Sequence, residues 1–296
     1  SPNVLAQAKI ADIIHFYKAN GVTNATRIKT EDYSKEEINR IQREVINTRG
    51  ELLFSKAVIL CEGVTEEQAL PVYFNEFFGT EPIFSGVNII GIGGQNYKSF
   101  LKLIKDFSIK WFIFSDGEQK TIKTVKNAIK IMTEEQIENL KNVVILEDGE
   151  DYETHLIHAG YQEIMKDAIN KCEESVIKQE DNQNGEERES YFDSFIRINN
   201  HTSCGRFKTD KAPCETCRQD IYEDKMRDYD GPDGLDRAIY DCCTGKNAKA
   251  KYARYIAEHI VFQATGKNKI PPKVISLFKE ISRELNLDVR SEYCET

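Results

Sequence analysis

The residues best suited to chemistry in this sequence are acids that follow directly after short apolar runs. The run AVILC leads into Glu62, KWFIFS leads into Asp116 with Glu118 two residues later, and NVVIL leads into Glu147 and Asp148. Carboxylate oxygens are the ligands that Mg²⁺ and similar hard cations prefer. Two such cations roughly 4 Å apart can activate a water molecule and stabilise the leaving oxygen when a phosphodiester bond is cleaved. The pattern therefore predicts a two-metal site for Mg²⁺ or Mn²⁺.

These acids can act together only if the apolar runs are neighbouring strands of one sheet. The runs at 57–63, 87–94, 110–118 and 142–148 alternate along the chain with segments of helical periodicity. Such alternation predicts an α/β fold in which a parallel sheet is flanked by helices. Ligands of such sheets bind beyond the carboxyl ends of the strands, so the acids are expected at one edge.

The helices between these runs are expected to begin at side chains that can cap them. Ser34, with Glu37 three residues later, has the pattern of a capping box, and Thr65 is the expected N-cap of the helix after Glu62. The expected helices are 34–50, 65–78, 96–107, 121–132, 133–140 and 151–176.

The composition changes after the last of these helices. The stretch 178–190 is polar and charged, which is typical of a loop or linker, and helical periodicity returns after 233. The sequence therefore divides into four parts. These are a connecting and helical segment at 1–52, a core at 53–176, an insertion at 177–233, and a helical part at 234–296 that completes the core domain.

The insertion holds paired soft ligands with the spacing of a zinc site. A His-x-x-Cys pair and a Cys-x-x-Cys pair are separated by nine residues. Four such ligands suit one tetrahedral, structural Zn²⁺. Reduced thiols in an irregular insertion explain the same residues, and Cys242 or Cys243 could replace the histidine. The expected zinc ligands are His201, Cys204, Cys214 and Cys217.

The bulk composition limits the class of protein and its surroundings. The net charge of −9 argues against a passive DNA coat, because such proteins neutralise phosphates with basic residues. It is compatible with a nuclease that has acidic metal ligands and a local basic surface. Neither an apolar stretch long enough for a membrane span nor a signal-peptide pattern is present, so no membrane association is expected. Eight cysteines in 296 residues fit a reducing cytoplasm.

Two acidic motifs, in this order, resemble the Toprim region of the OLD (overcoming lysogenization defect) family of nucleases. The segment 51–67, ELLFSKAVILCEGVTEE, is similar to that family's entry into its Toprim domain and contains the first acidic pair, Glu62 and Glu66. Asp116-x-Glu118 resembles the family's D-x-D motif, with glutamate in place of the second aspartate. This longer side chain can shift the metal preference or the geometry of the site.

Two later motifs extend the resemblance. Asp151-Tyr152-Glu153 resembles a motif that places one acid in the metal shell, and this acid is assigned to Glu153. The segment 245–260 resembles the part of the family that supplies a catalytic lysine. Lys249 is preferred for this role over Lys246 and Lys251. It lies one turn before an apolar helical face that is expected to pack on the sheet and consists of Ala253, Ile256, Ala257 and Ile260.

The resemblance covers roughly 1–160 and 235–265 and implies a metal-dependent DNA endonuclease that nicks DNA or cuts both strands. Ser1-Pro2-Asn3 resembles the sequence after the switch histidine of an ABC-type ATPase, so an ATP-binding domain is expected to precede this chain and regulate it. The family also implies a homo-oligomer. A Toprim domain elaborated in this way is similar to the nuclease subunits of Gabija anti-phage systems, which implies a role in defence and a helicase-like partner.

Each candidate residue also has an ordinary structural explanation. Glu62 and Glu66 could be solvated acids in a first helical turn, where they suit the helix dipole. Asp-Gly is a common turn dipeptide, which could account for Asp116. Asp151 could cap a helix, and Lys249 could be a surface lysine.

Other functions remain compatible with the same residues. One is a non-catalytic Toprim-like module that binds a partner protein or DNA. Another is Toprim chemistry of the primase or topoisomerase type, although the tyrosines form no recognisable motif. The glycines Gly91, Gly93 and Gly94 lack the lysine of a P-loop and indicate a tight turn instead.

Overall fold

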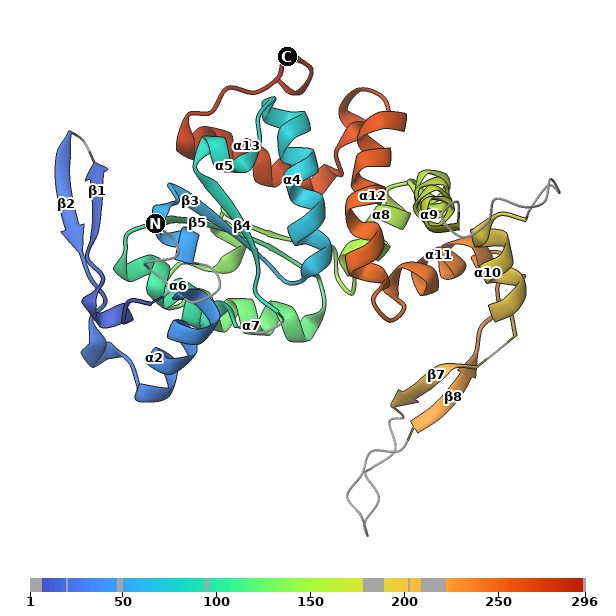
Figure 1. The fold of residues 1–296 in the computed structure, drawn as a ribbon, viewed down its shortest axis with the longest axis horizontal. Helices are drawn as coiled ribbons and strands as arrows, with labels where there is room; N and C mark the ends of the chain where they lie inside the picture. The colour runs from blue at the N-terminus through green and yellow to red at the C-terminus, as the bar shows by residue number, and fades with distance from the viewer. Residues whose placement is uncertain are drawn as a thin grey trace, which may run out of the picture.

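A sheet of four parallel strands lies at the centre of the chain (Figure 1). Its order is β4–β3–β5–β6, with β3 and β5 in the middle. The predicted α/β class and parallel sheet are therefore confirmed. The strands are β3 (Ala57–Cys61), β4 (Val87–Gly91), β5 (Lys110–Ser115) and β6 (Val143–Ile145).

The computed structural model describes most of the chain but not all of it. The described residues are 7–19, 21–46, 50–93, 96–177, 189–201, 203–208 and 222–294.

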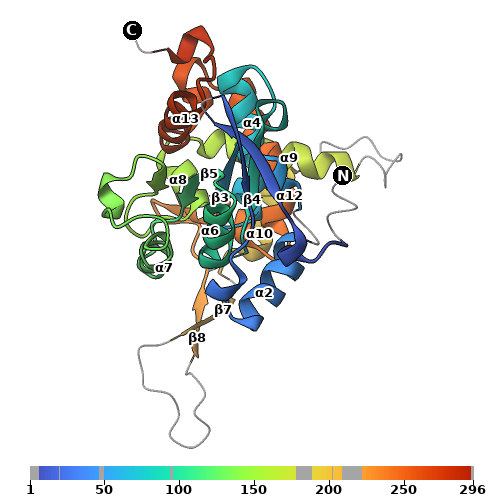
Figure 2. The same ribbon diagram turned by 90° about the vertical axis from the view of Figure 1, so that its left-hand side faces the viewer.

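Two apolar cores hold the sheet between layers of helices (Figure 1 and Figure 2). On the central strand β3, Ala57 and Ile59 face one core, while Val58 and Leu60 face the other, because side chains alternate along a strand. Each fully buried aliphatic side chain of this kind contributes about 1.5–3 kcal/mol. Helices α4 (Val64–Phe78) and α13 (Pro272–Leu285) line the first core, and α2 (Lys35–Ile41), α6 (Tyr97–Asp106) and α7 (Gln119–Ile129) line the second.

A group of helices extends the first core beyond α4, on the right in Figure 1. It contains α8 (Tyr152–His158), α9 (Gln162–Ile177), α10 (Tyr191–Asn199), α11 (Gly234–Thr244) and α12 (Ala248–Gln263). The apolar face of α12 was expected to pack on the sheet. This expectation was wrong, because α12 packs mainly on α4 and α9, one layer further out.

Two predicted helices differ from the observed ones. The single helix expected at 151–176 is divided into α8 and α9, because Gly160 adopts a left-handed φ of +88° between them. The helix expected at 133–140 is reduced to one short 3₁₀ turn, Ile137–Asn139. There the hydroxyl of Thr133 accepts a hydrogen bond from the N–H of Glu135, which favours a turn over a helix.

The N-terminal segment contains a hairpin that was not predicted, formed by β1 (His15–Ala19) and β2 (Val22–Thr26). The Asn-Gly dipeptide between the two strands is the sequence signal that could have revealed it. The predicted capping box of Ser34 and Glu37 is confirmed, but α2 ends at Ile41 and continues as a π-helical turn.

A second hairpin lies in the insertion, where β7 (Ser203–Lys208) pairs with β8 (Tyr222–Met226). The short helix α5 (Pro82–Ser85) precedes β4. Among the described residues, none of the helices is both long and apolar enough to cross a membrane.

Gly117 lies where the chain leaves β5 and passes close to the loop after β6. Its N–H donates to the carbonyl oxygen of Glu150 at 2.7 Å, and its own carbonyl oxygen accepts from the N–H of Gly149 at 2.9 Å. A Cβ atom at this position would lie 1.7 Å from the carbonyl oxygen of Glu147. Only glycine allows this approach, which fixes Asp116 beside the loop that leads into α8.

We expect Gly117→Ala to lower the free energy of unfolding by about 2 kcal/mol or more, since the added methyl group forces the two loops apart. Gly231→Ala is the matched control, because a Cβ there meets only a carboxylate oxygen of Asp228 at 3.8 Å. Chemical denaturation followed by circular dichroism measures both. Equal losses of stability in the two variants would contradict the close approach at Gly117.

Candidate active site

The ends of three strands deliver acids to the carboxyl edge of the sheet. Glu62 follows β3 and Asp116 follows β5, its immediate neighbour in the sheet. Beyond β6, the N–H of Leu146 still donates to the carbonyl oxygen of Ser115 at 3.0 Å, which keeps the third strand end beside the second. The structure thus places the strand-end acids at one edge.

Glu62 and Asp116 each keep one carboxylate oxygen without a donor. Glu62 Oε1 accepts from the hydroxyl of Thr121 at 3.5 Å. Glu62 Oε2 and Asp116 Oδ1 are buried and receive no hydrogen bond from an N–H, hydroxyl or ammonium group of the described residues, and the two carboxyl groups lie near enough to share a proton. A buried polar group left in this state costs about 1–3 kcal/mol, and more when it is charged. These two oxygens are therefore suited to a ligand that brings positive charge.

Glu66 and Glu153 lie deeper, each only 3% exposed, and each has at least one oxygen that accepts a hydrogen bond. Glu66 Oε2 accepts from the N–H of Gly63 at 3.2 Å, and α4 begins with Gly63 as its N-cap. The expectation that Thr65 caps this helix was therefore wrong. Thr65 instead donates its hydroxyl to Glu153 Oε1 at 2.9 Å, which ties α4 to α8.

Lys249 reaches this cluster from the first turn of α12. Its Nζ donates to Glu153 Oε2 at 3.0 Å. Lys251 points elsewhere and pairs with Glu173 of α9 at 2.6 Å, while Lys246 is exposed before the helix. Of the three lysines considered from the sequence, the structure thus brings Lys249 to the acids.

The remaining acids of the edge have different surroundings. Asp151 caps α8, since its Oδ1 accepts from the N–H of Thr154 at 2.9 Å, and its Oδ2 accepts from the hydroxyl of Tyr240 at 2.9 Å. The structural explanation left open for Asp151 therefore applies. Glu118 is exposed at the N-cap position of α7 and makes no capping hydrogen bond.

Glu147 and Asp148 are engaged with neighbouring helices. Glu147 pairs with Lys273 of α13 at 2.7 Å. Asp148 accepts a hydrogen bond from the side chain of Gln119 at the start of α7.

Burial and mutual repulsion govern the charges of the cluster. Burial raises the pKa of Asp116 to about 9, and the carboxylates of Glu66 and Glu62 add to this shift. Burial also raises the pKa of Glu66 to about 7, and it raises the pKa of Glu62 above its ordinary value. Burial alone would lower the pKa of Lys249, but the carboxylate of Glu153 outweighs it and the pKa is raised. The lysine is therefore a fixed positive charge beside acids that resist ionisation.

Three hydroxyl groups that hold these acids were not identified from the sequence. They belong to Thr65, Thr121 and Tyr240, which donate to Glu153, Glu62 and Asp151 respectively. Each pair is far apart in the chain, by 88, 59 and 89 residues. No local spacing could have revealed them, because the contacts depend on how the helices pack.

The glycines after β4 lie against this edge. A Cβ at Gly91 would lie 2.8 Å from the carbonyl oxygen of Gly63, so the strand end packs closely on the loop after β3. Gly93 has a left-handed φ of +64°, whereas Gly94 lies outside the described residues.

The predicted zinc site falls mostly outside what the structure describes. Cys214 and Cys217 lie outside the described residues, and of Cys204 only its place in β7 is described. His201 is exposed, and its Nε2 lies 2.9 Å from Asp230 Oδ2. The alternative ligands Cys242 and Cys243 are buried in the first core.

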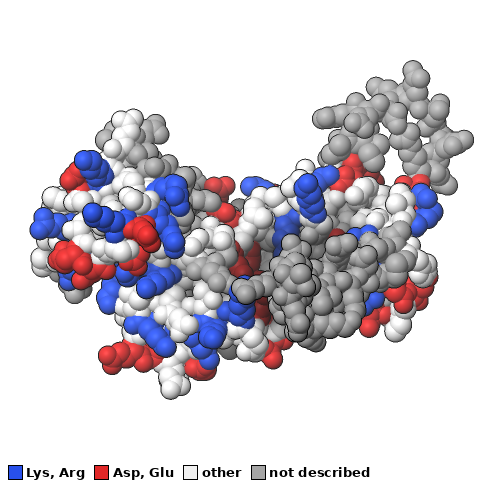
Figure 3. Space-filling view, turned by 90° about the horizontal axis from the view of Figure 1, so that it is seen from below, with Lys and Arg blue, Asp and Glu red and all other residues white. Residues whose placement is uncertain are grey.

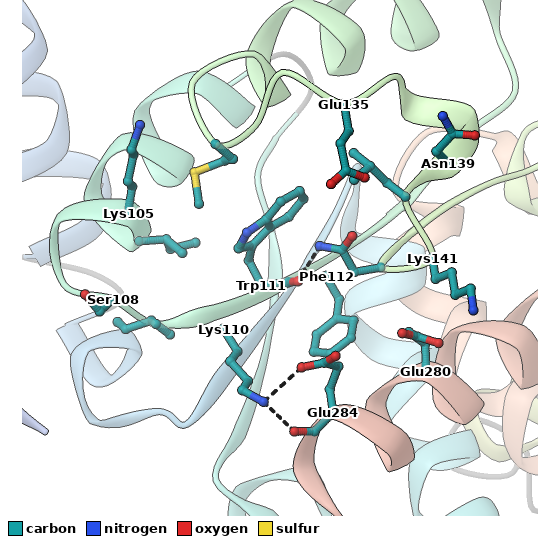
Figure 4. Close-up of a pocket in the computed structure, with 15 residues that line it drawn as sticks. Lys105, Ser108, Lys110, Trp111, Phe112, Glu135, Asn139, Lys141, Glu280 and Glu284 are labelled. Carbon is teal, nitrogen blue, oxygen red and sulfur yellow. Dashed lines mark hydrogen bonds and ion pairs between the residues drawn. The ribbon is translucent and has the colours of Figure 1, made fainter. Parts of the chain in front are cut away.

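The two large pockets lie at the opposite, amino edge of the sheet. One, of about 600 Å³, is lined by Trp111, Phe112 and Met132, and Lys110 pairs there with Glu284 (Figure 4). The other, of about 790 Å³, lies between the β1–β2 hairpin and the same strand start. Neither is lined by any of the candidate acids, so neither belongs to the site.

A comparison with known families agrees with this arrangement. Residues 53–117, which run from before β3 to the glycine after β5, match the family described as overcoming lysogenization defect protein-like, TOPRIM domain. This segment is therefore similar to the Toprim domain of OLD-like proteins. The resemblance predicted from the two acidic motifs is therefore confirmed for this segment.

No curated protein sequence matches the chain. Among solved structures, the C-terminal region of the Xanthomonas campestris pv. campestris OLD protein aligns with a TM-score of 0.47 at 18% identity, over 80% of this chain and 97% of that one. The C-terminal region of the Burkholderia pseudomallei OLD protein aligns with a TM-score of 0.47 at 13% identity, over 78% of this chain and 99% of that one.

Toprim domains generally bind divalent metal ions, and the side chains of this edge fit such an ion in their chemistry. They are oxygen ligands, and two of them keep buried oxygens without donors. As they stand, no three His, Cys, Asp or Glu side chains of the described residues form a group that could hold a metal.

Asp116→Asn keeps the shape of the side chain and removes a carboxyl group that must be protonated to be buried. Because burial raises the pKa of Asp116 to about 9, the side chain ionises in the unfolded chain but stays protonated in the native one, and stability falls as the pH rises from the ordinary pKa toward 9. We therefore expect the variant to melt about 2–4 °C higher than wild type at pH 8 in EDTA, which corresponds to about 1 kcal/mol.

The exposed Glu118 gives the matched control, since Glu118→Gln should leave the melting temperature in EDTA unchanged. Mn²⁺ should raise the melting temperature of wild type but not that of Asp116→Asn. A lower melting temperature of Asp116→Asn in EDTA would mean that the native carboxylate is stabilised rather than repelled.

Proposed function

We propose that this chain is a divalent-metal-dependent DNA endonuclease of the Toprim type. The observation that supports this proposal best is the pair of buried oxygens, Glu62 Oε2 and Asp116 Oδ1, that receive no hydrogen bond from an N–H, hydroxyl or ammonium group of the described residues. They lie at the edge of the sheet where ligands of parallel α/β folds bind. A hydrolase that cleaves phosphodiester bonds needs such oxygens for Mg²⁺ or Mn²⁺.

The acids divide into two groups in this proposal. Glu62, Asp116 and Glu118 hold the metal ions, since they have oxygens that no described residue engages. Glu66, Asp151 and Glu153 form a second group whose oxygens accept hydrogen bonds from protein donors. In the metal-bound state these three complete the metal shells or orient the first group.

The bound metal ions would supply a nucleophilic water and stabilise the charge of the phosphate in the transition state. The chain's own contribution is to position its groups and exclude water. Lys249 adds a fixed positive charge, held in place by Glu153 at 3.0 Å, for the charge that develops on the phosphate. The hydroxyl of Thr121 orients Glu62 from the first turn of α7.

The wider setting is part of the same proposal. A preceding ATPase domain regulates the cleavage, the whole protein forms a homo-oligomer in the cytoplasm, and a helicase-like protein is its partner in anti-phage defence of the Gabija type. One structural Zn²⁺ holds the insertion. These features are proposed from the sequence resemblance and from the spacing of the Cys and His residues.

Glu62→Gln and Asp116→Asn are each expected to lower the rate of plasmid nicking at least about 100-fold with Mg²⁺ or Mn²⁺, because each removes a metal ligand. Conversion of supercoiled plasmid to open-circular and linear forms measures the rate. Glu147→Gln is the control, since that acid pairs with Lys273 and should cut at nearly the wild-type rate. If Glu62→Gln or Asp116→Asn nicked plasmid at the wild-type rate, the assignment of that residue as a metal ligand would be refuted.

Lys249→Ala is expected to lose cleavage while its affinity for DNA stays nearly unchanged, because a charge that acts on the transition state affects the chemical step. Lys251→Ala is the matched control on the same helix and should cut well, since Lys251 pairs with Glu173 away from the acids. Single-turnover rates and equilibrium binding separate the two effects. The reverse pattern would transfer the role to Lys251.

A further inference from the structure

Helix α7 is a basic helix in an acidic chain. The chain has 49 Asp and Glu against 40 Lys and Arg, yet α7, with the sequence QKTIKTVKNAI, contains three lysines and no acid. Its buried side consists of Thr121, Val125, Ala128 and Ile129, and the last three of these belong to the second core.

The lysines of α7 lie on the side away from that core. Lys120 and Lys123 are exposed, and Lys123 lies directly opposite the buried side when the residues are placed at 100° intervals around the helix. Figure 3 shows Lys and Arg side chains interspersed with Asp and Glu on the underside of the body, the side on which α7 lies in Figure 1. We define Lys120 and Lys123 as the α7 lysine face.

The lysine face starts at the candidate active site. Glu118 is the residue before α7, and the side chain of Thr121 in its first turn contacts Glu62 at 3.5 Å. One turn of a helix rises about 5 Å, so both lysines lie within about one turn of Thr121 along the helix axis. Lys123 lies on the opposite side of the helix from Thr121, so the lysine face borders the acidic edge rather than pointing into it. The two lysines can therefore contact backbone phosphates that flank a phosphate bound at that edge.

These two cations are not engaged with other parts of the chain. Among the described residues, neither Lys120 nor Lys123 has an ion-pair or hydrogen-bond partner through its ammonium group, whereas Lys126 on the same helix pairs with Glu138 at 2.7 Å. An acidic cluster at neutral pH repels a polyanion, so a polyanionic substrate requires positive charge next to the cluster. Lysine provides a flexible point charge that suits a phosphate without selecting a base sequence.

We propose that the α7 lysine face binds the phosphate backbone of duplex DNA beside the scissile phosphate. This inference rests on the proposed function and names the surface along which the substrate lies. The charge complementarity between unpaired lysines and phosphates supports duplex DNA as the occupant. The contacts are independent of base sequence, and they set affinity rather than the chemical step.

The test measures how the affinity for a duplex depends on salt. The Asp116→Asn chain, which the proposed function makes inactive, serves as the parent, and fluorescence anisotropy with a labelled duplex of about 30 base pairs gives Kd across a range of NaCl concentrations. Each lost lysine–phosphate contact reduces the slope of log K against log[NaCl] by about 0.9. Lys120→Gln with Lys123→Gln should therefore reduce it by about 1.8 and raise Kd roughly 60-fold at 0.1 M NaCl.

The matched control removes two other exposed lysines, Lys141→Gln with Lys267→Gln. Lys141 lines the pocket at the amino edge of the sheet, and Lys267 follows α12 at its far end (Figure 4 for Lys141). The control should keep the parent's slope and Kd. The proposal is overturned if the parent shows no salt-dependent binding of the duplex, if the α7 variant keeps the parent's slope, or if the control loses as much as the α7 variant.

The two proposals fail in different ways. If wild type does not cleave plasmid DNA but the α7 variant still loses salt-dependent binding, the proposed function fails and the binding surface stands. If wild type cleaves and the α7 variant binds as the parent does, the binding surface fails and the proposed function stands.

Discussion

The structure depends on holding several carboxylates close together where little water reaches them. Like charges a few ångströms apart repel strongly in a medium of low dielectric constant, which is why burial and neighbouring acids raise the pKa of Asp116 to about 9. Two apolar cores oppose this repulsion. Both middle strands are buried from both faces, so their ends cannot move apart without exposing core side chains to water.

The acids at the edge of the sheet fall into two groups, which differ in whether hydrogen-bond donors lie within reach of their carboxylate oxygens. Glu66 and Glu153 sit among a helix N-terminus, a hydroxyl group and Lys249, and each has an oxygen that is fixed by a hydrogen bond. Glu62 and Asp116 follow strands in the middle of the sheet, where the next backbone donors are used elsewhere: the N–H of Gly63 by Glu66 and the N–H of Gly117 by the carbonyl oxygen of Glu150. Their unpaired oxygens are the part of the edge that an incoming cation can stabilise most.

The sequence was sufficient to predict the sheet and its acidic edge, because both depend on local signals. An apolar run followed by an acid identifies a strand end, and alternation with helices implies parallel pairing. The partners of the acids could not be predicted in the same way. The periodicity of α12 showed that Ala253 and Ile256 are buried, but not that they pack on α4 rather than on the sheet. The hydroxyl of Tyr240 meets Asp151 only because α11 packs on α8.

The positions of the cations follow from the same sheet. Lys249 approaches the edge from the first core, through α12, and the α7 lysine face approaches it from the second core, directly after Glu118. Gly117 lies between β5 and α7, and its close contact with the carbonyl oxygen of Glu147 fixes both the end of this strand and the start of this helix. A phosphate bound at this edge would thus have acids beneath it and lysines on two sides. An anionic substrate can approach an acidic cluster only if such cations flank it, since without them the repulsion that burial intensifies would also act on the substrate.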